Sequence, residues 1–181
     1  MDCDKDLQRY LVFSEKEIPT VNEILKKIGA TKIIVRKHSS SEEIDFRVPH
    51  NANISELKEK LGNQNILIPV LEDFSGMPIQ EMLETAERLI SEERFWEAHN
   101  VLEDLWKNSA GKSKQVFHDI IGIVVSQIKV QMNQESTGQT VYLRNIAHLK
   151  EQRIDLITNQ LPEKFSYPIK LKLSELSRYL Q

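Results

Sequence analysis

Hydrophobic residues in the N-terminal part of the chain follow two different spacings. Four runs of apolar and β-branched residues predict strands, at positions 10–13, 31–36, 44–48 and 66–71. Between them, apolar residues recur every three or four positions and predict two amphipathic helices, at positions 21–28 and 54–61. The run at 31–36 is apolar at its centre, which predicts a central strand. Pro69 cannot donate a backbone hydrogen bond, so it belongs at a sheet edge or a bulge.

Local signals bound these predicted helices. Thr20 and Glu23 form a capping box at the start of the first helix, because each side chain can bond the other's backbone N–H. Gly29 and Gly62 follow the two helices as their closing residues. The resulting order, βαββαβ, predicts a ferredoxin-like domain over residues 1–76.

Helical spacing dominates the rest of the chain. An acidic stretch followed by Ser75, Gly76 and Pro78 predicts a domain boundary, with a helical bundle over residues 77–181. The pattern predicts about five helices, at 79–91, 95–108, 113–134, from about 141 to Pro162, and 169–180. The stretch QESTGQ at 134–139 predicts a turn between the third and fourth helices. The chain is therefore expected to be an α+β protein of two domains.

The segment FWEAHNVLEDLWK, residues 95–107, contains the candidate functional residues. His99 and Glu103 are four positions apart and Trp106 lies three further on, so a helix would place all three on one face. Trp96 and apolar residues share that face, which predicts that the histidine and the carboxylate are buried. A buried carboxylate without a partner costs several kcal/mol. We therefore expect Glu103 to bond His99 or the indole N–H of Trp106.

The same segment carries a resemblance to a known family. Together with VFHDIIGIVVSQ, which follows about ten residues later, it resembles the signature of domain-of-unknown-function family 309, over roughly residues 81–161. His99, Glu103 and Trp106 match the family pattern, whereas Asn100 stands where the family commonly has Glu. Asp119 and Ile120 likewise stand where the family commonly has Gln-Gly. The resemblance implies a compact helical bundle, typically from prokaryotes, with no established activity.

Three interpretations of His99 and Glu103 follow from their chemistry. They are part of a buried hydrogen-bonded network, a metal site completed by His118 or Asp119, or a general acid–base pair. The ExxH spacing of di-iron bundles is absent, because Trp96 precedes His99 by three positions. Likewise, Gln115 precedes His118 by three. No glycine-rich phosphate loop or nucleophile motif accompanies the pair. We therefore interpret the polar cluster as structural and assign no metal or cofactor. The cluster consists of His99, Glu103, Trp106, His118 and Asp119.

Composition and charge narrow the function classes. The chain has 181 residues, a formal net charge of -3 and one cysteine, Cys3, so it can form no intramolecular disulfide. Charges of both signs are interspersed, and we do not expect nucleic-acid binding. The first twenty residues lack the pattern of a signal peptide, and the longest apolar runs are too short to span a bilayer. A cytoplasmic protein is the expectation.

Charge is also distributed unevenly. Residues 80–104 are acidic apart from Arg88 and Arg94, while residues 164–178 carry lysines and arginine with a single acid, Glu175. These charges belong either to solvated helix faces or to complementary packing of the last helix against the first two. In function, we favour a binding or assembly protein over an enzyme, with a protein or small molecule as ligand and a homodimer through an apolar helix face. The alternative is a small hydrolase or metal-binding protein that uses His99 and Glu103.

Overall fold

The computed structural model describes residues 7–14, 19–61, 66–70, 73–74, 76–158, 165 and 167–179. The chain divides into two compact units, unit 1 (Met1–Leu71) and unit 2 (Glu72–Gln181). Unit 1 contains a sheet with helices and unit 2 is helical, which confirms the predicted α+β class. The predictions for Gly62, Ser75 and Pro162, and for the last residue of the range 169–180, lie outside the described residues.

The described part of unit 1 holds a four-stranded sheet in the order β2-β3-β1-β4, with antiparallel neighbours throughout. Its elements are β1 (Leu7–Ser14), α1 (Pro19–Lys27), β2 (Thr31–Lys37), β3 (Glu42–Pro49), α2 (Ile54–Leu61) and β4 (Ile66–Pro69). The predicted alternation of strands and helices is thus confirmed. β4 is an edge strand, the kind of position that Pro69 requires.

Strand β2 lies at the other edge of the sheet, so the prediction of a central strand there is wrong. Ile34 and Val35 are 46% and 42% exposed, although their β-branched side chains favour strand structure anywhere in a sheet. The register between β2 and β3 shifts between Thr31 and Ile34, and Lys32 has a φ of 51°. This irregularity, flanked by Lys37 at the far end of the strand, interrupts a regular exposed edge, which hinders pairing with other strands.

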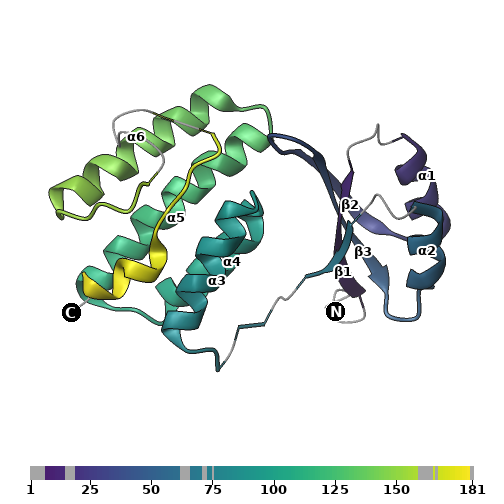
Figure 1. Cartoon of the computed structure of the whole chain (residues 1–181), viewed down its shortest axis with the longest axis horizontal. Helices are drawn as coiled ribbons and strands as arrows, with labels where there is room; N and C mark the ends of the chain where they lie inside the picture. The colour runs from purple at the N-terminus through teal and green to yellow at the C-terminus, as the bar shows by residue number, and fades with distance from the viewer. Residues whose placement is uncertain are drawn as a thin grey trace. The chain divides into compact units, whose positions relative to one another are not determined.

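The two faces of the sheet differ in chemistry. Alternate residues on β1 and β3 form an apolar core with the helices α1 and α2, which cover that face together (Figure 1). The core includes Tyr10, Val12, Val21, Leu25, Ile44, Phe46, Val48 and Leu57. The intervening residues, such as Arg9 on β1 and Asp45 on β3, point to the second face, because side chains alternate along a strand.

Unit 2 is built from helices that pack in chain order. They are α3 (Ile79–Ser91), α4 (Phe95–Lys107), α5 (Gly111–Gln131) and α6 (Glu135–Glu151), followed by a short 3-10 helix, η1 (Leu173–Arg178). α3 packs on α4, α4 on α5 and α5 on α6, while η1 returns to α3 (Figure 1). The apolar residues predicted for α3 and α4 form one core with those of α5 and α6, so these helices confirm the periodic pattern.

The C-terminal part of unit 2 differs from the prediction. α6 begins at Glu135, inside the predicted turn, because Asn133 alone adopts a left-handed φ of 58° and joins α5 to α6. α6 ends at Glu151, well before Pro162, where Arg153 has a φ of 59°. The predicted fifth helix over 169–180 is confirmed only in part, because the structure has the short 3-10 helix η1 at Leu173–Arg178 and an extended chain before it. The apolar residues at the start of this range also fit the alternating pattern of a strand. The chain before η1 is extended, and Leu171 forms a β-bridge with Ile157.

Helices α5 and α6 approach closely at two glycines. A Cβ atom at Gly138 on α6 would lie 2.6 Å from the backbone oxygen of Ser126 on α5. A Cβ atom at Gly122 on α5 would lie 2.3 Å from the side chain of Asn145 on α6. Since real Cβ atoms do not approach other heavy atoms this closely, Gly138 sets the spacing of the two helices, while Gly122 leaves the space that the Asn145 side chain fills.

The charge asymmetry has a local explanation. Glu87 of α3 accepts hydrogen bonds of 2.8 Å from both the backbone N–H and the hydroxyl of Ser174 in η1. Lys172 instead donates to Glu175 at 2.9 Å, and Arg178 lies 3.5 Å from the same carboxylate. The C-terminal segment therefore packs against α3, but the contact is made by the neutral Ser174, while Lys172 and Arg178 pair with Glu175 of their own segment.

Candidate functional site

The candidate residues lie on α4, which has two distinct sides. Phe95, Ala98, Leu102 and Leu105 recur at helical spacing and are buried in the core of unit 2. Beside them runs a partly exposed line of four residues, which we call the α4 stripe: Trp96, His99, Glu103 and Trp106. The helical spacing brings these four side chains onto one surface, as the sequence predicts.

His99 and Glu103 are neighbours on the stripe without a hydrogen bond between them. The distance from His99 Nε2 to Glu103 Oε1 is 3.8 Å, which is too long for one. The Glu103 side chain is 41% exposed and lies 3.6 Å from Lys107 Nζ, one helical turn further on. The prediction that Glu103 is buried is therefore wrong, because the stripe runs along the margin of the core, where water and a lysine solvate the carboxylate.

His99 is more enclosed than its partner. Its side chain is 19% exposed, and its ring meets the Trp96 indole edge-on with centroids 6.1 Å apart. The Nδ1 atom is buried and has no hydrogen-bond partner among the residues that the structure describes. A ring nitrogen of an imidazole is either an N–H donor or an acceptor, so His99 has an unused polar group directed away from water.

Trp106 ends the stripe at the C-terminal part of α4. Lys114 of α5 lies over its ring, with Nζ 4.6 Å from the centroid, a cation–π contact. The two residues line a shallow cavity of about 350 Å³ with Gln115 and His118. The structure thus brings Trp106 and His118, both predicted for one polar cluster, to the same cavity.

Asp119 lies at a different place, between α5 and α6. It is fully buried and its Oδ1 lies 3.2 Å from His148 Nδ1 of α6, while Gln152 donates to Oδ2 at 3.1 Å. Gln115 donates to Oδ1 at 3.2 Å, and His118 Nδ1 lies 3.5 Å from the same oxygen. The predicted cluster therefore divides between two helices: His99, Glu103 and Trp106 lie on the α4 stripe, and His118 and Asp119 lie on α5, with His118 also lining the cavity beside Trp106. His148 and Gln152 were missed because only the folded α5–α6 pair brings them near.

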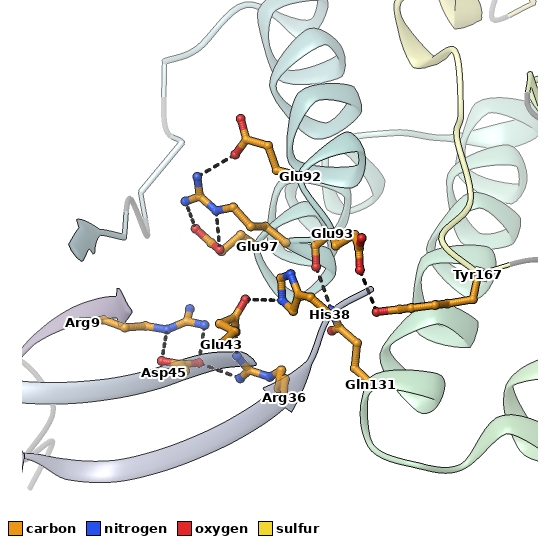
Figure 2. Close-up of polar contacts among 11 residues, drawn as sticks. Arg9, Arg36, His38, Glu43, Asp45, Glu92, Glu93, Glu97, Gln131 and Tyr167 are labelled. Carbon is orange, nitrogen blue, oxygen red and sulfur yellow. Dashed lines mark hydrogen bonds and ion pairs between the residues drawn. The ribbon is translucent and has the colours of Figure 1, made fainter. Parts of the chain in front are cut away.

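The buried carboxylate of α4 is Glu97, a residue outside the predicted polar cluster. Arg94 Nε donates to Glu97 Oε2 at 2.9 Å and Arg94 also bonds the other oxygen, while a third bond of 3.0 Å joins Arg94 to Glu92 (Figure 2). Burial alone would lower the pKa of Arg94, but the hydrogen bonds and charges of Glu97 and Glu92 raise it above its usual value. The signal was available, because Arg94 precedes Glu97 by three positions.

Glu93 completes the polar contacts at the start of α4. Its carboxylate accepts a hydrogen bond of 2.9 Å from the Tyr167 hydroxyl, and its carbonyl accepts one of 2.8 Å from Gln131 (Figure 2). Glu93 has a φ of 58°, the left-handed conformation that closes α3. These bonds connect the α3–α4 turn to α5 and to the C-terminal segment, and they hold the start of α4 in place.

Unit 1 has a charged network of its own on the second face of its sheet. Arg9 donates two hydrogen bonds, of 2.9 and 2.7 Å, to Asp45 (Figure 2). Arg36 bonds the same carboxylate at 2.6 Å and also bonds Glu43, which lies 3.1 Å from His38. Burial would raise the pKa of Asp45, but the hydrogen bonds and charges of the two arginines lower it below its ordinary value. Each buried charge in this network therefore has an opposite charge beside it.

The geometry limits the chemistry of the stripe. A general base needs an orienting hydrogen bond, and the 3.8 Å separation between His99 and Glu103 does not supply one. Among the residues that the structure describes, no three His, Cys, Asp or Glu side chains gather as a metal-binding group. In the same residues, no helix is long and apolar enough to cross a membrane. Two partly exposed tryptophans around a histidine and a glutamate are features of a contact surface.

Fold and site together define a helical domain with an aromatic, polar stripe on its second helix, attached to a small α/β unit. Residues 83–141 match the family described as Domain of unknown function (DUF309), so this part of the chain is a DUF309 domain. The matched residues contain the α4 stripe and Asp119 but end before His148. No curated protein and no solved structure matches the chain.

Proposed function

We propose that this chain is a binding or assembly protein, and that it assembles by pairing the α4 stripe with the stripe of a second copy. The observation that carries the proposal is the order of residues in the stripe. His99 and Glu103 lie symmetrically about Val101, and Trp96 and Trp106 lie symmetrically about the same residue. The stripe therefore presents the same chemistry when read in either direction.

A two-fold axis through the middle of the stripe, level with Val101 along the helix, would use this symmetry. In a two-fold interface, each residue contacts a counterpart that contacts it in return. Two antiparallel α4 helices would then set each His99 against the other copy's Glu103 and each Trp96 against the other copy's Trp106. The His99 ring, which is 19% exposed, would gain a carboxylate neighbour on its exposed side, and the tryptophans would lose their remaining exposure to water.

An exchange of charge tests this pairing. Sedimentation equilibrium of the full chain should give a dimer. His99→Glu would oppose Glu103 of the other copy in both halves of the interface, and it should weaken the dimer at least about tenfold. The double variant His99→Glu with Glu103→His restores opposite partners and should restore the dimer. Gln139→Glu, on the exposed part of α6, adds the same charge and should change nothing.

Two results would overturn the proposal. A wild-type chain that stays monomeric at high concentration would remove the second copy as the partner. If His99→Glu dimerises as tightly as the wild type, the dimer interface lies elsewhere than on the stripe. Thermal melting of each variant separates these results from unfolding, because a variant that still melts cooperatively is folded.

The alternative proposal, a small hydrolase or metal-binding protein, uses the same histidine. It is supported by the buried Nδ1 of His99, which bonds none of the described residues, and by the proximity of Glu103, but it needs a hydrogen bond that the two side chains do not make. For unit 1, we infer the ferredoxin-like arrangement. The strand order β2-β3-β1-β4 with antiparallel neighbours supports it, as does the position of both helices on one face.

A further inference from the structure

Unit 2 contains a second concave feature, away from the stripe. A cavity of about 540 Å³ lies between α3, α4 and α5, beside the segment that enters α3. Its volume is within the range of small-molecule sites, which run from about 300 to 1,000 Å³. The proposed dimer does not use it.

The floor of this cavity is apolar. Phe74, Met82, Leu105 and Phe117 line it, and all four are buried in the core of unit 2. Ile79 stands at its side and is 62% exposed, the highest exposure among the large apolar residues described. Large apolar side chains that remain in water beside a cavity are features of ligand sites, because a ligand can cover them.

The rim of the cavity is polar and carries charge of one sign. Its ionisable lining residues among those described are Asp73 and Asp104, both carboxylates. Asn108, Ser109 and Ser113 supply neutral polar groups on the same rim. Lys107 lies 3.5 Å from Asp104 and its side chain is 57% exposed, so it is a solvated partner that a ligand cation can replace.

From these three observations we infer that the cavity binds a small organic amine with a hydrophobic body. The phenylalanine and methionine side chains receive the apolar part, and methionine adapts to its shape. The ammonium group faces the carboxylates of Asp73 and Asp104 at the rim. A carboxylate on the ligand would meet charge of its own sign there, so the site selects by charge as well as by shape.

Three matched probes test the inference on the full chain. They are 2-phenylethylammonium, 2-phenylethanol and 3-phenylpropionate, which share a phenyl body and differ in charge. Titration followed by amide chemical shifts should show the ammonium probe binding most tightly and the carboxylate least. Asp104→Asn should weaken the ammonium probe about fivefold, the effect of one charge pair in water, and should leave the alcohol unchanged.

Two further variants complete the design. Ser113→Phe places a ring at the rim and should abolish binding of all three probes, while Glu81→Gln, which removes an exposed charge on α3 outside the lining, should change none. Equal affinity for the ammonium and carboxylate probes would overturn the inference. Amide chemical-shift changes that are the same in Ser113→Phe as in the wild type would also overturn it. No binding of the ammonium probe at millimolar concentration would also overturn it. Because His99→Glu leaves this cavity intact, failure of the dimer and failure of the site are distinguishable.

Discussion

Replacing Asp119 with asparagine tests the interpretation of α5 and α6 as a pair held by one buried carboxylate. The asparagine would keep the size of the side chain but would turn one acceptor oxygen into a donor. His148 and Gln152 bond different oxygens of Asp119, at 3.2 and 3.1 Å, and Gln115 donates as well. The new Nδ2 would therefore either orphan one present donor, or make the Gln152 amide turn over and accept a neutral bond in place of a charge-assisted one. An orphaned buried donor costs about 1–3 kcal/mol, and a hydrogen bond to a charged group contributes about 1.5–3 kcal/mol.

Relief from burying a charge offsets part of this loss, and we expect Asp119→Asn to lower the free energy of unfolding of unit 2 by about 2 kcal/mol. The chain's two tryptophans, Trp96 and Trp106, both lie on α4, so their fluorescence reports the unfolding of unit 2. In urea, with a slope of about 2 kcal/mol per molar, the midpoint should fall by about 1 M. Asp155→Asn, on an exposed carboxylate, should stay within about 0.5 kcal/mol of wild type. The same small change for Asp119→Asn would refute the reasoning.

Two other predictions concern packing and pH. Gly138→Ala puts a methyl group against the Ser126 backbone and should destabilise unit 2 by about 1–3 kcal/mol in the same urea assay. Ala147→Gly, at an exposed position of α6, should cost only the helix propensity, about 1 kcal/mol, and a stabilised Gly138→Ala would contradict the close approach. Folding lowers the pKa of Asp45 from its ordinary value of 3.8. The ionised carboxylate therefore adds its full share to the stability of unit 1 above pH 3.8, and this share is lost as the pH falls through the lower folded value. The protection factors of the β1 and β3 amides, which correct for the slower intrinsic exchange in acid, should therefore fall on acidification, and should fall less in Asp45→Asn. An equal loss of protection in both proteins would count against this role of Asp45.

Periodic patterns predicted the regular elements well, because burial of one side of a helix or strand leaves a repeated mark in the sequence. The predicted bounds of α3 match the structure at both ends, and the strands alternate as expected. The prediction of a helix in the C-terminal segment failed at its start, because Ile169, Leu171 and Leu173 fit both an alternating and a helical pattern. The backbone bonds that decide between them join residues 156–158 to 170–172, and no local pattern records such pairings.

In the candidate site too, contacts within one helix were predicted and contacts between helices were not. Local spacing placed His99, Glu103 and Trp106 on one surface, since four positions along a helix bring side chains together. Spacing does not tell which part of that surface faces water, so Glu103 was placed inside and Glu97 was overlooked. The partners of Asp119 lie on another helix and beyond it, and their approach depends on how closely α5 and α6 pack. That closeness comes from small residues, which hydrophobic periodicity ignores.

The contact between Gly122 and Asn145 restricts how this protein can change through evolution. A substitution at position 122 alone meets the Asn145 side chain at once, whereas a smaller residue at position 145 would first open space for it. The order of the two changes therefore matters, because a change that begins at position 122 must first push the Asn145 side chain out of its hydrogen bond to Val141, and a change that begins at position 145 does not. Relatives that carry a side chain at position 122 should consequently have a small residue at position 145, and the two positions should vary together.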